Sequence, residues 1–221
     1  MELGYWNVRG RAELLRVLLR YLHIDYKEVN PQSIEDAHAI FAKHHFIFPN
    51  LPYLVDGDNH VTESSAMWLY VLQKANRDDL RGHPGIEQIH HQEVLGVLGD
   101  IREALVKVVC RPKFQEKWEK TAKPLLRRKY RELSALLGDK DYLFGHLTFA
   151  DFALWLSIRF TEVVLRALEV GVEDFWGEWK NLPQLAARIE SFPELQEYFK
   201  SEEFRKRPYI SDFLTKLKIG N

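Results

Sequence analysis

A proline-led hairpin followed by a helix start constrains the fold of this chain more than any other stretch. Pro52 lacks the N–H that a central strand donates, so it suits a strand's first residue or an edge strand. The run 53–55 after it reads as a short strand, 56–59 as a tight loop, and 60–62 as the returning strand. Bonds before proline are the only common cis peptide bonds, and a cis Leu51-Pro52 bond would turn backbone groups outward. The stretch predicts a two-stranded platform with a proline corner.

The helix start comes directly after this hairpin. Glu63, Ser64 and Ser65 stand where the strand gives way to the helical spacing of 66–73. Serine hydroxyls and free backbone amides gather at a helix N-terminus, and the helix dipole makes that end attract carboxylates. Taken singly, either serine is equally well explained as an N-cap and Pro52 as an ordinary strand start. The residues alone therefore leave both a structural and a binding role open.

The composition excludes several classes of function. With 221 residues, 46% of them hydrophobic, the chain suits one large or two small globular domains. Thirty-one basic and 32 acidic residues give a formal net charge of −1, which offers no attraction to nucleic acid or anionic lipid. We see neither a membrane-spanning apolar run nor a leader sequence. The single cysteine, Cys110, excludes an internal disulfide and suits the cytosol, so we expect a cytoplasmic protein.

The order of elements around the hairpin predicts an α/β domain. The other patterned segments of this half are a strand at 3–6, a turn at 9–11, a helix at 15–22, a strand at 26–29 and a weak helix within 31–47. The resulting order, βαβαββα with a right-handed first crossover, is typical of a thioredoxin-like fold. A charged stretch with glycine and proline, 77–85, reads as a linker. We expect domains at 1–78 and 86–221, joined by 79–85.

Almost every segment beyond the linker has helical spacing. One long helix is predicted from 86 to 108, ended by Arg111 and Pro112, and a second from 118 to 137, stopped at Gly138. Two long antiparallel helices suggest a bundle, so the second domain should be all-helical.

A helix start within that domain has a distinct local signal. Thr148 with Asp151 three residues later is a capping-box variant, and Leu147 with Phe152 is placed for a hydrophobic staple. Helices at 182–191 and 194–204 follow, and a tail runs to Asn221.

These features together resemble the cytosolic glutathione transferases over nearly the whole chain. The stretches 5–10, 48–54 and 200–208 are similar to stretches of the mu class. The sequence Arg-Gly-Arg-Ala-Glu at 9–13 and the short segment before Phe48 resemble the sigma class instead. The resemblance implies glutathione as co-substrate and no permanently bound cofactor.

Tyr5 is the residue to which the resemblance assigns catalysis. A thiol with a pKa of ~8.5 is only a minority thiolate at neutral pH, and the thiolate is the nucleophile. Lowering that pKa by about two units takes ~2.7 kcal/mol, and a hydrogen bond to a charged group supplies roughly 1.5 to 3. Tyr5 ends the first strand beside the first helix start, so its hydroxyl is placed to donate to the sulfur.

The resemblance also assigns the glutathione site. Leu51 pairs through its backbone, Ser64 takes the γ-glutamyl carboxylate, and Asp100 reaches the γ-glutamyl amine in the neighbouring subunit. The mu-class tryptophan near the glycine carboxylate has no counterpart within 34–47, and Lys43 is the cation best placed to replace it. The implied glutathione-binding residues are Tyr5, Trp6, Arg11, Lys43, Asn50, Leu51, Pro52, Glu63, Ser64 and Asp100.

The resemblance further implies an electrophile site and a homodimer. The residues expected to line the electrophile site are Val8, Arg11, Ala104, Val108, Cys110, Tyr209 and Ile210. Cys110 stands where the mu class often has a tyrosine, which argues against tyrosine-assisted additions and favours a packed thiol. Phe48 stands where the mu class inserts an aromatic key into its partner. No metal site is expected, because the adjacent histidines at 44–45 and 90–91 usually diverge.

Three functions are consistent with this reading. The leading hypothesis is a detoxifying transferase that adds the glutathione thiolate to hydrophobic electrophiles. The alternatives are a sigma-like, glutathione-dependent isomerase of the prostaglandin type and a non-catalytic binding or structural protein on the same fold. Tyr5, Ser64 and Asp100 together argue against the last, since a scaffold needs none of them.

Overall fold

The predicted platform is present in the computed structural model, which describes residues 1–110 and 114–210. The Leu51-Pro52 peptide bond is cis. Strand β3 (Tyr53–Asp56) pairs antiparallel with β4 (Asn59–Thr62), and Gly57 adopts a φ of +60° in the turn between them. The loop is shorter than predicted, because Asp56 and Asn59 pair with each other as the last rung of the ladder.

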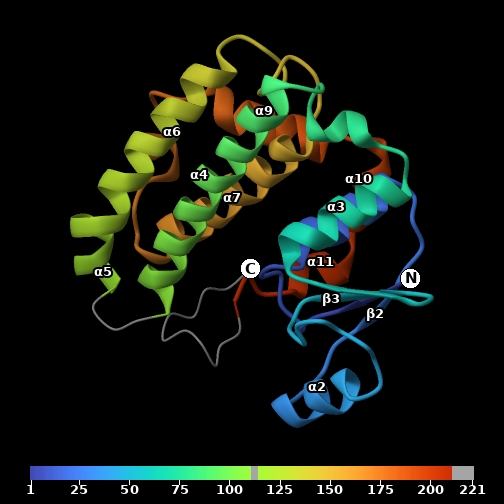
Figure 1. Cartoon of the computed structure of the whole chain (residues 1–221). Coiled ribbons are helices and arrows are strands. Elements are labelled where there is room, and N and C mark those ends of the chain that lie inside the picture. The colour runs from blue at the N-terminus through green and yellow to red at the C-terminus, as the bar shows by residue number, and fades with distance from the viewer. Residues whose placement is uncertain (111–113, 211–221) are drawn as a thin grey trace.

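The first half of the chain has the predicted βαβαββα order. Its other elements are β1 (Glu2–Gly4), α1 (Glu13–Tyr21), β2 (Lys27–Val29), α2 (Ile34–Phe41) and α3 (Ser64–Lys74). The strand order is β2-β1-β3-β4, with β1 parallel to β2 and antiparallel to β3. Figure 1 shows α3 above the strands and α2 below them. This mixed sheet with helices is a thioredoxin-like domain.

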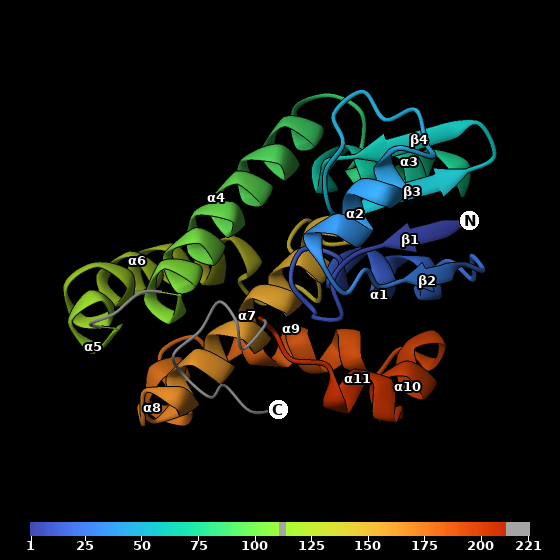
Figure 2. The ribbon, with the colours of Figure 1, turned by 90° about the horizontal axis from the view of Figure 1, so that it is seen from below.

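The second half is helical from α4 onward. After a 3-10 turn, η1 (Asp78–Arg81), come α4 (Ile86–Val109), α5 (Phe114–Lys117), the π-helical turn η2 (Trp118–Ala122), α6 (Lys123–Leu137), α7 (Phe149–Ala167), α8 (Val172–Trp176), α9 (Asn181–Glu190), α10 (Pro193–Lys200) and α11 (Glu202–Lys206). Figure 2 shows α4 and α7 running alongside one another, away from the sheet domain. The expected helix stop at Arg111 and Pro112 and the tail 211–221 lie outside the described residues. Among the described helices, none combines the length and the apolar character needed to cross a bilayer.

One predicted helix is wrong. The apolar spacing suggested a single helix at 194–204, but the chain forms α10 and α11 with a break at Ser201. Ser201 has an extended backbone (φ −67°, ψ 152°), and its hydroxyl accepts a hydrogen bond from the Phe204 N–H. A serine that caps a new helix start interrupts the backbone ladder without changing the apolar spacing, so the pattern alone missed it.

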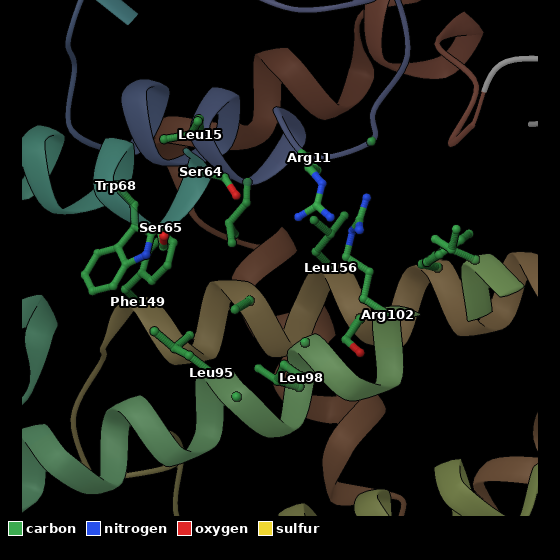
Figure 3. Close-up of a pocket in the computed structure, with 18 of the residues that line it drawn as sticks. Arg11, Leu15, Ser64, Ser65, Trp68, Leu95, Leu98, Arg102, Phe149 and Leu156 are labelled. Carbon is green, nitrogen blue, oxygen red and sulfur yellow. The ribbon is translucent and has the colours of Figure 1, made fainter. Parts of the chain in front are cut away.

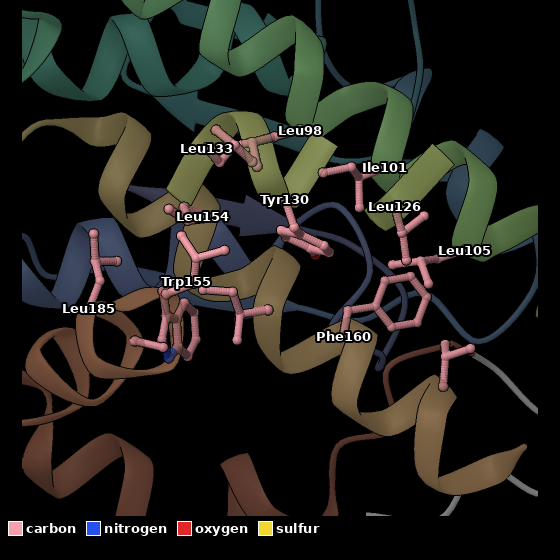
Figure 4. Close-up of a cluster of buried hydrophobic side chains, with 14 of the residues drawn as sticks. Leu98, Ile101, Leu105, Leu126, Tyr130, Leu133, Leu154, Trp155, Phe160 and Leu185 are labelled. Atoms are coloured by element: carbon pink, nitrogen blue, oxygen red, sulfur yellow. The ribbon is translucent and has the colours of Figure 1, made fainter. Parts of the chain in front are cut away.

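The predicted capping box at the start of α7 is confirmed. The Asp151 carboxylate accepts hydrogen bonds from the Thr148 N–H at 2.7 Å and from the Leu143 N–H at 2.8 Å. The helix it starts is almost wholly buried, and α4, α6 and α9 pack around the cluster shown in Figure 4. The labelled side chains of that cluster are Leu98, Ile101, Leu105, Leu126, Tyr130, Leu133, Leu154, Trp155, Phe160 and Leu185.

A buried ionic network joins the two halves. Arg16 on α1 is fully buried and pairs with Glu13 at 3.1 Å and with Glu28 at 2.6 Å. Arg207, beyond α11, also reaches Glu28, at 3.1 Å. Burial acts to raise the pKa of Glu28, but the guanidinium charges of Arg16 and Arg207 hold that pKa below its ordinary value. The end of the second domain is therefore fixed against β2 and α1, next to the turn that carries Tyr5.

Candidate functional site

Tyr5 directly follows β1 and lies under the turn that leads into α1. Its side chain is buried, and its hydroxyl oxygen accepts a hydrogen bond from the Arg11 backbone N–H at 3.3 Å. Gly10 in this turn has a φ of +45°, and a Cβ there would lie 2.7 Å from the Tyr5 hydroxyl. Only glycine allows the turn to close over the ring in this way. The hydroxyl is thus held as an acceptor on one side, which leaves its own proton available to donate.

Of the residues around Tyr5, Trp6, Val8 and Leu51 belong to the predicted set and Ala12 does not. Tyr5, Val8 and Ala12 form a small buried cluster, and the side chains of Trp6 and Leu51 pack against it. The β1–α1 turn and the cis-proline loop therefore meet at the tyrosine.

The corner before α3 brings the predicted polar residues together. Glu63 has a φ of +62°, which is uncommon for a residue with a side chain, and Ser64 begins the helix. The Asn50 side-chain amide donates to Glu63 Oε1 at 3.1 Å, and its Oδ1 accepts from the Leu51 N–H at 2.9 Å. The cis-proline loop is thus tied to the helix start, and helix-end amides lie beside a serine hydroxyl.

A cavity of about 520 Å³ lies between the two domains. From the predicted set, its lining includes Arg11, Glu63, Ser64, Tyr209 and Ile210. Other predicted residues do not line it, namely Tyr5, Trp6, Val8, Asn50, Leu51, Pro52 and Cys110. Tyr5 adjoins the cavity through Gly10 and Arg11, which do line it. Figure 3 shows the α4 and α7 side chains that close its other side. These include Leu95, Leu98, Arg102, Val106, Phe149, Leu156 and Phe160. The cavity therefore joins a polar corner to a largely apolar wall.

Ala104 and Val108 do not line this cavity, contrary to expectation. They line a second cavity of about 480 Å³ with Asp100 and residues of η2 and α6. Because successive helix residues are about 100° apart, Ala104 points almost opposite to Arg102 and Val106. Arg102 and Val106 are the α4 residues that the sequence reading missed, and the spacing of three and four residues from Leu95 through Leu98 and Arg102 to Val106 would have found them.

Comparison with known proteins decides the family. The family model described as the N-terminal domain of glutathione S-transferase matches residues 1–73, and the C-terminal domain model matches 99–202. The chain is 32% identical over 216 residues to glutathione S-transferase 2 of Gallus gallus, covering 94% of this chain and 93% of that protein. The chain belongs to the glutathione S-transferase family.

Other members of the glutathione S-transferase family are similarly close. This glutathione S-transferase is 31% identical over 220 residues to glutathione S-transferase Mu 2 of Homo sapiens, with 96% of this chain and 95% of that protein covered. The crystal structure of the glutathione S-transferase Blo t 8 matches its fold with a TM-score of 0.81 at 26% identity, covering 97% of this chain and 98% of that one.

Several predicted residues of this glutathione S-transferase lie away from the cavity. Lys43 is exposed beyond α2, and Phe48 is 69% exposed. Asp100 is exposed on α4, with its carboxylate 3.6 Å from the Lys129 ammonium. Cys110 is partly buried at the end of α4. The predicted roles of Phe48 and Asp100 need a second subunit, so for both residues they stay predictions.

Arg9 has a structural role that the sequence reading did not assign. Its guanidinium donates to the Arg207 carbonyl at 3.1 Å and to the Phe204 carbonyl at 2.7 Å, and it lies over the Tyr209 ring at 4.4 Å. The Gly10 N–H donates to the Tyr209 carbonyl at 3.0 Å. These contacts hold Tyr209 in the glutathione S-transferase cavity, where its ring stacks on Phe160.

One group among the described residues has the spacing of metal ligands, and it contains none of the adjacent histidines at 44–45 and 90–91. His83, Glu87 and His146 bring ligand atoms within 4.8 Å of one another. Glu87 already accepts a hydrogen bond from the His83 N–H at 2.7 Å and lies 3.3 Å from His146 Nε2. These contacts tie the linker to the loop before α7.

Proposed function

We propose that this protein is a cytosolic, homodimeric enzyme that adds the glutathione thiolate to apolar electrophiles. The observation that carries the proposal is the Tyr5 hydroxyl, which the Arg11 N–H holds beside a cavity with one polar and one apolar side. Relatives at about 30% identity over nearly the full chain are named glutathione S-transferases, which supports the activity.

Tyr5 would act on the sulfur. The Tyr5 O–H donates a hydrogen bond to the glutathione sulfur, which favours the thiolate and lowers the thiol pKa from ~8.5. The thiol proton leaves to solvent. With an aryl halide, the sulfur forms a bond to the ring carbon that carries the halogen, and the halide leaves with the bonding electron pair. With an enal, the sulfur adds to the β-carbon, and the α-carbon takes a proton from water.

The polar corner would bind the peptide part of glutathione. We assign the γ-glutamyl carboxylate to Ser64 and the free amides at the start of α3. We assign the cysteinyl backbone to Leu51, whose N–H now bonds the Asn50 side chain, so glutathione would displace that side-chain contact. Lys43 would approach the glycine carboxylate. Asp100 of a second subunit would complete the site, with Phe48 as the aromatic contact between subunits.

An assay of purified protein with three acceptors tests the function. Glutathione is supplied with 1-chloro-2,4-dinitrobenzene, with an enal and with a prostaglandin endoperoxide. We expect turnover of the aryl halide or the enal. Turnover of the endoperoxide alone would favour an isomerase. Glutathione binding with no turnover of any acceptor would favour a non-catalytic member of the fold.

A further inference from the structure

Arg11 and Arg102 bring two guanidinium groups to the same part of the interdomain cavity. Arg11 precedes α1 and Arg102 lies on α4, and Figure 3 shows their side chains pointing toward one another. Burial, and next the charge of Arg11, lower the pKa of Arg102. Arg11 is exposed and Arg102 is half-buried, so the fold holds two like charges together at this cavity, which is unfavourable unless an anion joins them.

No carboxylate among the described residues forms an ion pair with either group. The acidic neighbours of Arg102 along α4 are engaged elsewhere, since Asp100 lies 3.6 Å from Lys129 and Glu103 lies 2.5 Å from Lys107.

Among the described residues, every other buried or half-buried arginine has an acidic partner except Arg9, whose guanidinium donates to backbone carbonyls. Arg16 pairs with Glu13 and Glu28, and Arg159 pairs with Glu162 and Glu190. Within the described residues, the cavity pair thus differs from Arg16 and Arg159 in having no carboxylate partner.

The surroundings of the pair are apolar. Val106 of α4, Phe160 of α7, Tyr209 and Ile210 line the same cavity, and the rings of Phe160 and Tyr209 stack with centroids 5.5 Å apart. A ligand that suits both the two guanidinium groups and the apolar lining has an apolar body and one anionic group.

The sequence places Arg11 in both the expected glutathione site and the expected electrophile site, and the proposed function assigns neither carboxylate of glutathione, nor its thiolate, to the pair. Ser64 takes its γ-glutamyl carboxylate, Lys43 faces its glycine carboxylate, and Tyr5 holds its thiolate. Because the Arg11 N–H bonds the Tyr5 hydroxyl, Arg11 lies close to the position that the proposed function gives the reacting sulfur.

We propose that Arg11 and Arg102 form a subsite for a carboxylate on the electrophile, so that the preferred acceptors are apolar electrophiles bearing a carboxylate. The inference rests on the proposed function and narrows its substrate class. A guanidinium is a planar fork of donors that matches a carboxylate in two parallel hydrogen bonds, and such bonds are stronger than neutral ones.

Calorimetric binding of two glutathione conjugates tests the subsite without turnover. The probes are S-benzylglutathione and S-(4-carboxybenzyl)glutathione, which differ only in the carboxylate. Wild-type protein should bind the carboxylated conjugate at least tenfold more tightly, and added sodium chloride should shrink that preference. Arg102→Gln should reduce the preference by about tenfold or more. Lys107→Gln removes one positive charge from the same helix outside this cavity, and it should keep the preference.

The possible outcomes distinguish a failure of the subsite proposal from a failure of the proposed function. Equal affinity of the wild type for the two conjugates overturns the subsite and leaves the transferase function intact. An equal loss for both conjugates in Arg102→Gln assigns Arg102 to glutathione itself and also overturns the subsite. Binding of neither conjugate by the wild type overturns the proposed function and the subsite with it. If Arg102→Gln does not fold, Arg11→Gln and the salt dependence of the wild type provide the same comparison.

Discussion

The backbone N–H of Arg11 donates a hydrogen bond to the hydroxyl oxygen of Tyr5 at 3.3 Å. The turn that starts α1 thereby orients the tyrosine whose proton the proposed chemistry uses. Gly10 makes this contact possible, because a side chain there would overlap the ring.

Removal of the Tyr5 hydroxyl should raise the pKa of bound glutathione. Tyr5→Phe keeps the ring packing and deletes only the donor, so the fold and most of the glutathione affinity should survive. The thiol pKa should return towards ~8.5, and turnover at neutral pH should fall about ten- to a hundredfold. Thiolate absorbance titrations of both complexes, with their rate–pH profiles, measure this. Identical titrations would show that Tyr5 is not the partner of the thiolate.

Gly10→Ala should also raise the thiol pKa of bound glutathione, because it displaces the Tyr5 ring. A Cβ at Gly10 would lie 2.6 Å from the ring carbon Cε1, and the backbone there has a positive φ. Gly57→Ala is the matched control, because Gly57 also has a positive φ but nothing within 4 Å of its added Cβ. Both variants should lose roughly 1 to 2 kcal/mol of stability from the backbone strain. Only Gly10→Ala should lose turnover, and equal activity in both variants would contradict the steric argument.

Ser64→Ala should weaken glutathione binding more than chemistry. It removes one hydroxyl partner of a carboxylate and leaves the helix-end amides, so the affinity should fall by roughly 1.5 to 3 kcal/mol. Ser65→Ala removes the neighbouring hydroxyl of the same helix turn and should have a smaller effect. Calorimetry with glutathione measures both, and an unchanged affinity for Ser64→Ala would remove Ser64 from the site.

Phe48→Ser should shift the protein towards monomer. Phe48 is 69% exposed in the single chain, as expected of a residue that fills a pocket on a partner. Ile34→Ser is a suitable control, since Ile34 is an apolar residue of the same domain that is 62% exposed. A concentration series by analytical ultracentrifugation, with activity measured alongside, compares them. A fully active dimer of Phe48→Ser at low concentration would place the contact elsewhere.

His91 should make the protein less stable in mild acid. It is fully buried, neither ring nitrogen has a hydrogen-bond partner among the residues that the structure describes, and burial, with Arg81 as a further cause, lowers its pKa to about 4. Between the ordinary value of 6.5 and about 4, the unfolded chain binds a proton that the folded chain does not, so stability falls as the pH falls through that range.

The variant His91→Leu isolates this effect. Its unfolding free energy should drop by about 2 kcal/mol less than that of the wild type between pH 7 and pH 4.5. Urea unfolding at the two pH values measures both drops. Equal drops would show that His91 is protonated in the folded state.

The structural features that depend on residues close together in the chain were the ones best predicted from the sequence. The proline-led hairpin, the Ser64 helix start and the Thr148–Asp151 capping box each depend on residues a few positions apart, and each is present. The orientation of α4 was not predictable in the same way, because apolar residues such as Leu95 and Val106 on one side and Ala104 on the other lie on more than one face of the helix. A charged residue such as Arg102 adds no apolar signal of its own, and only its place in the helical spacing of Leu95, Leu98 and Val106 indicates that it faces the cavity. The partners of Arg9 lie so far along the chain that no local pattern indicates them.

The contact between Arg9 and Arg207 has a consequence for the order of folding. It joins residues 198 positions apart, whereas the sheet pairings and the helices of each domain are made within a much shorter span. Closing the longer span costs more chain entropy and slows the step that depends on it. Each domain can therefore be largely formed while Tyr209 is still free. The refolding protein should regain its helical circular dichroism before it regains the closed cavity, and recovery of ligand binding should lag behind recovery of secondary structure.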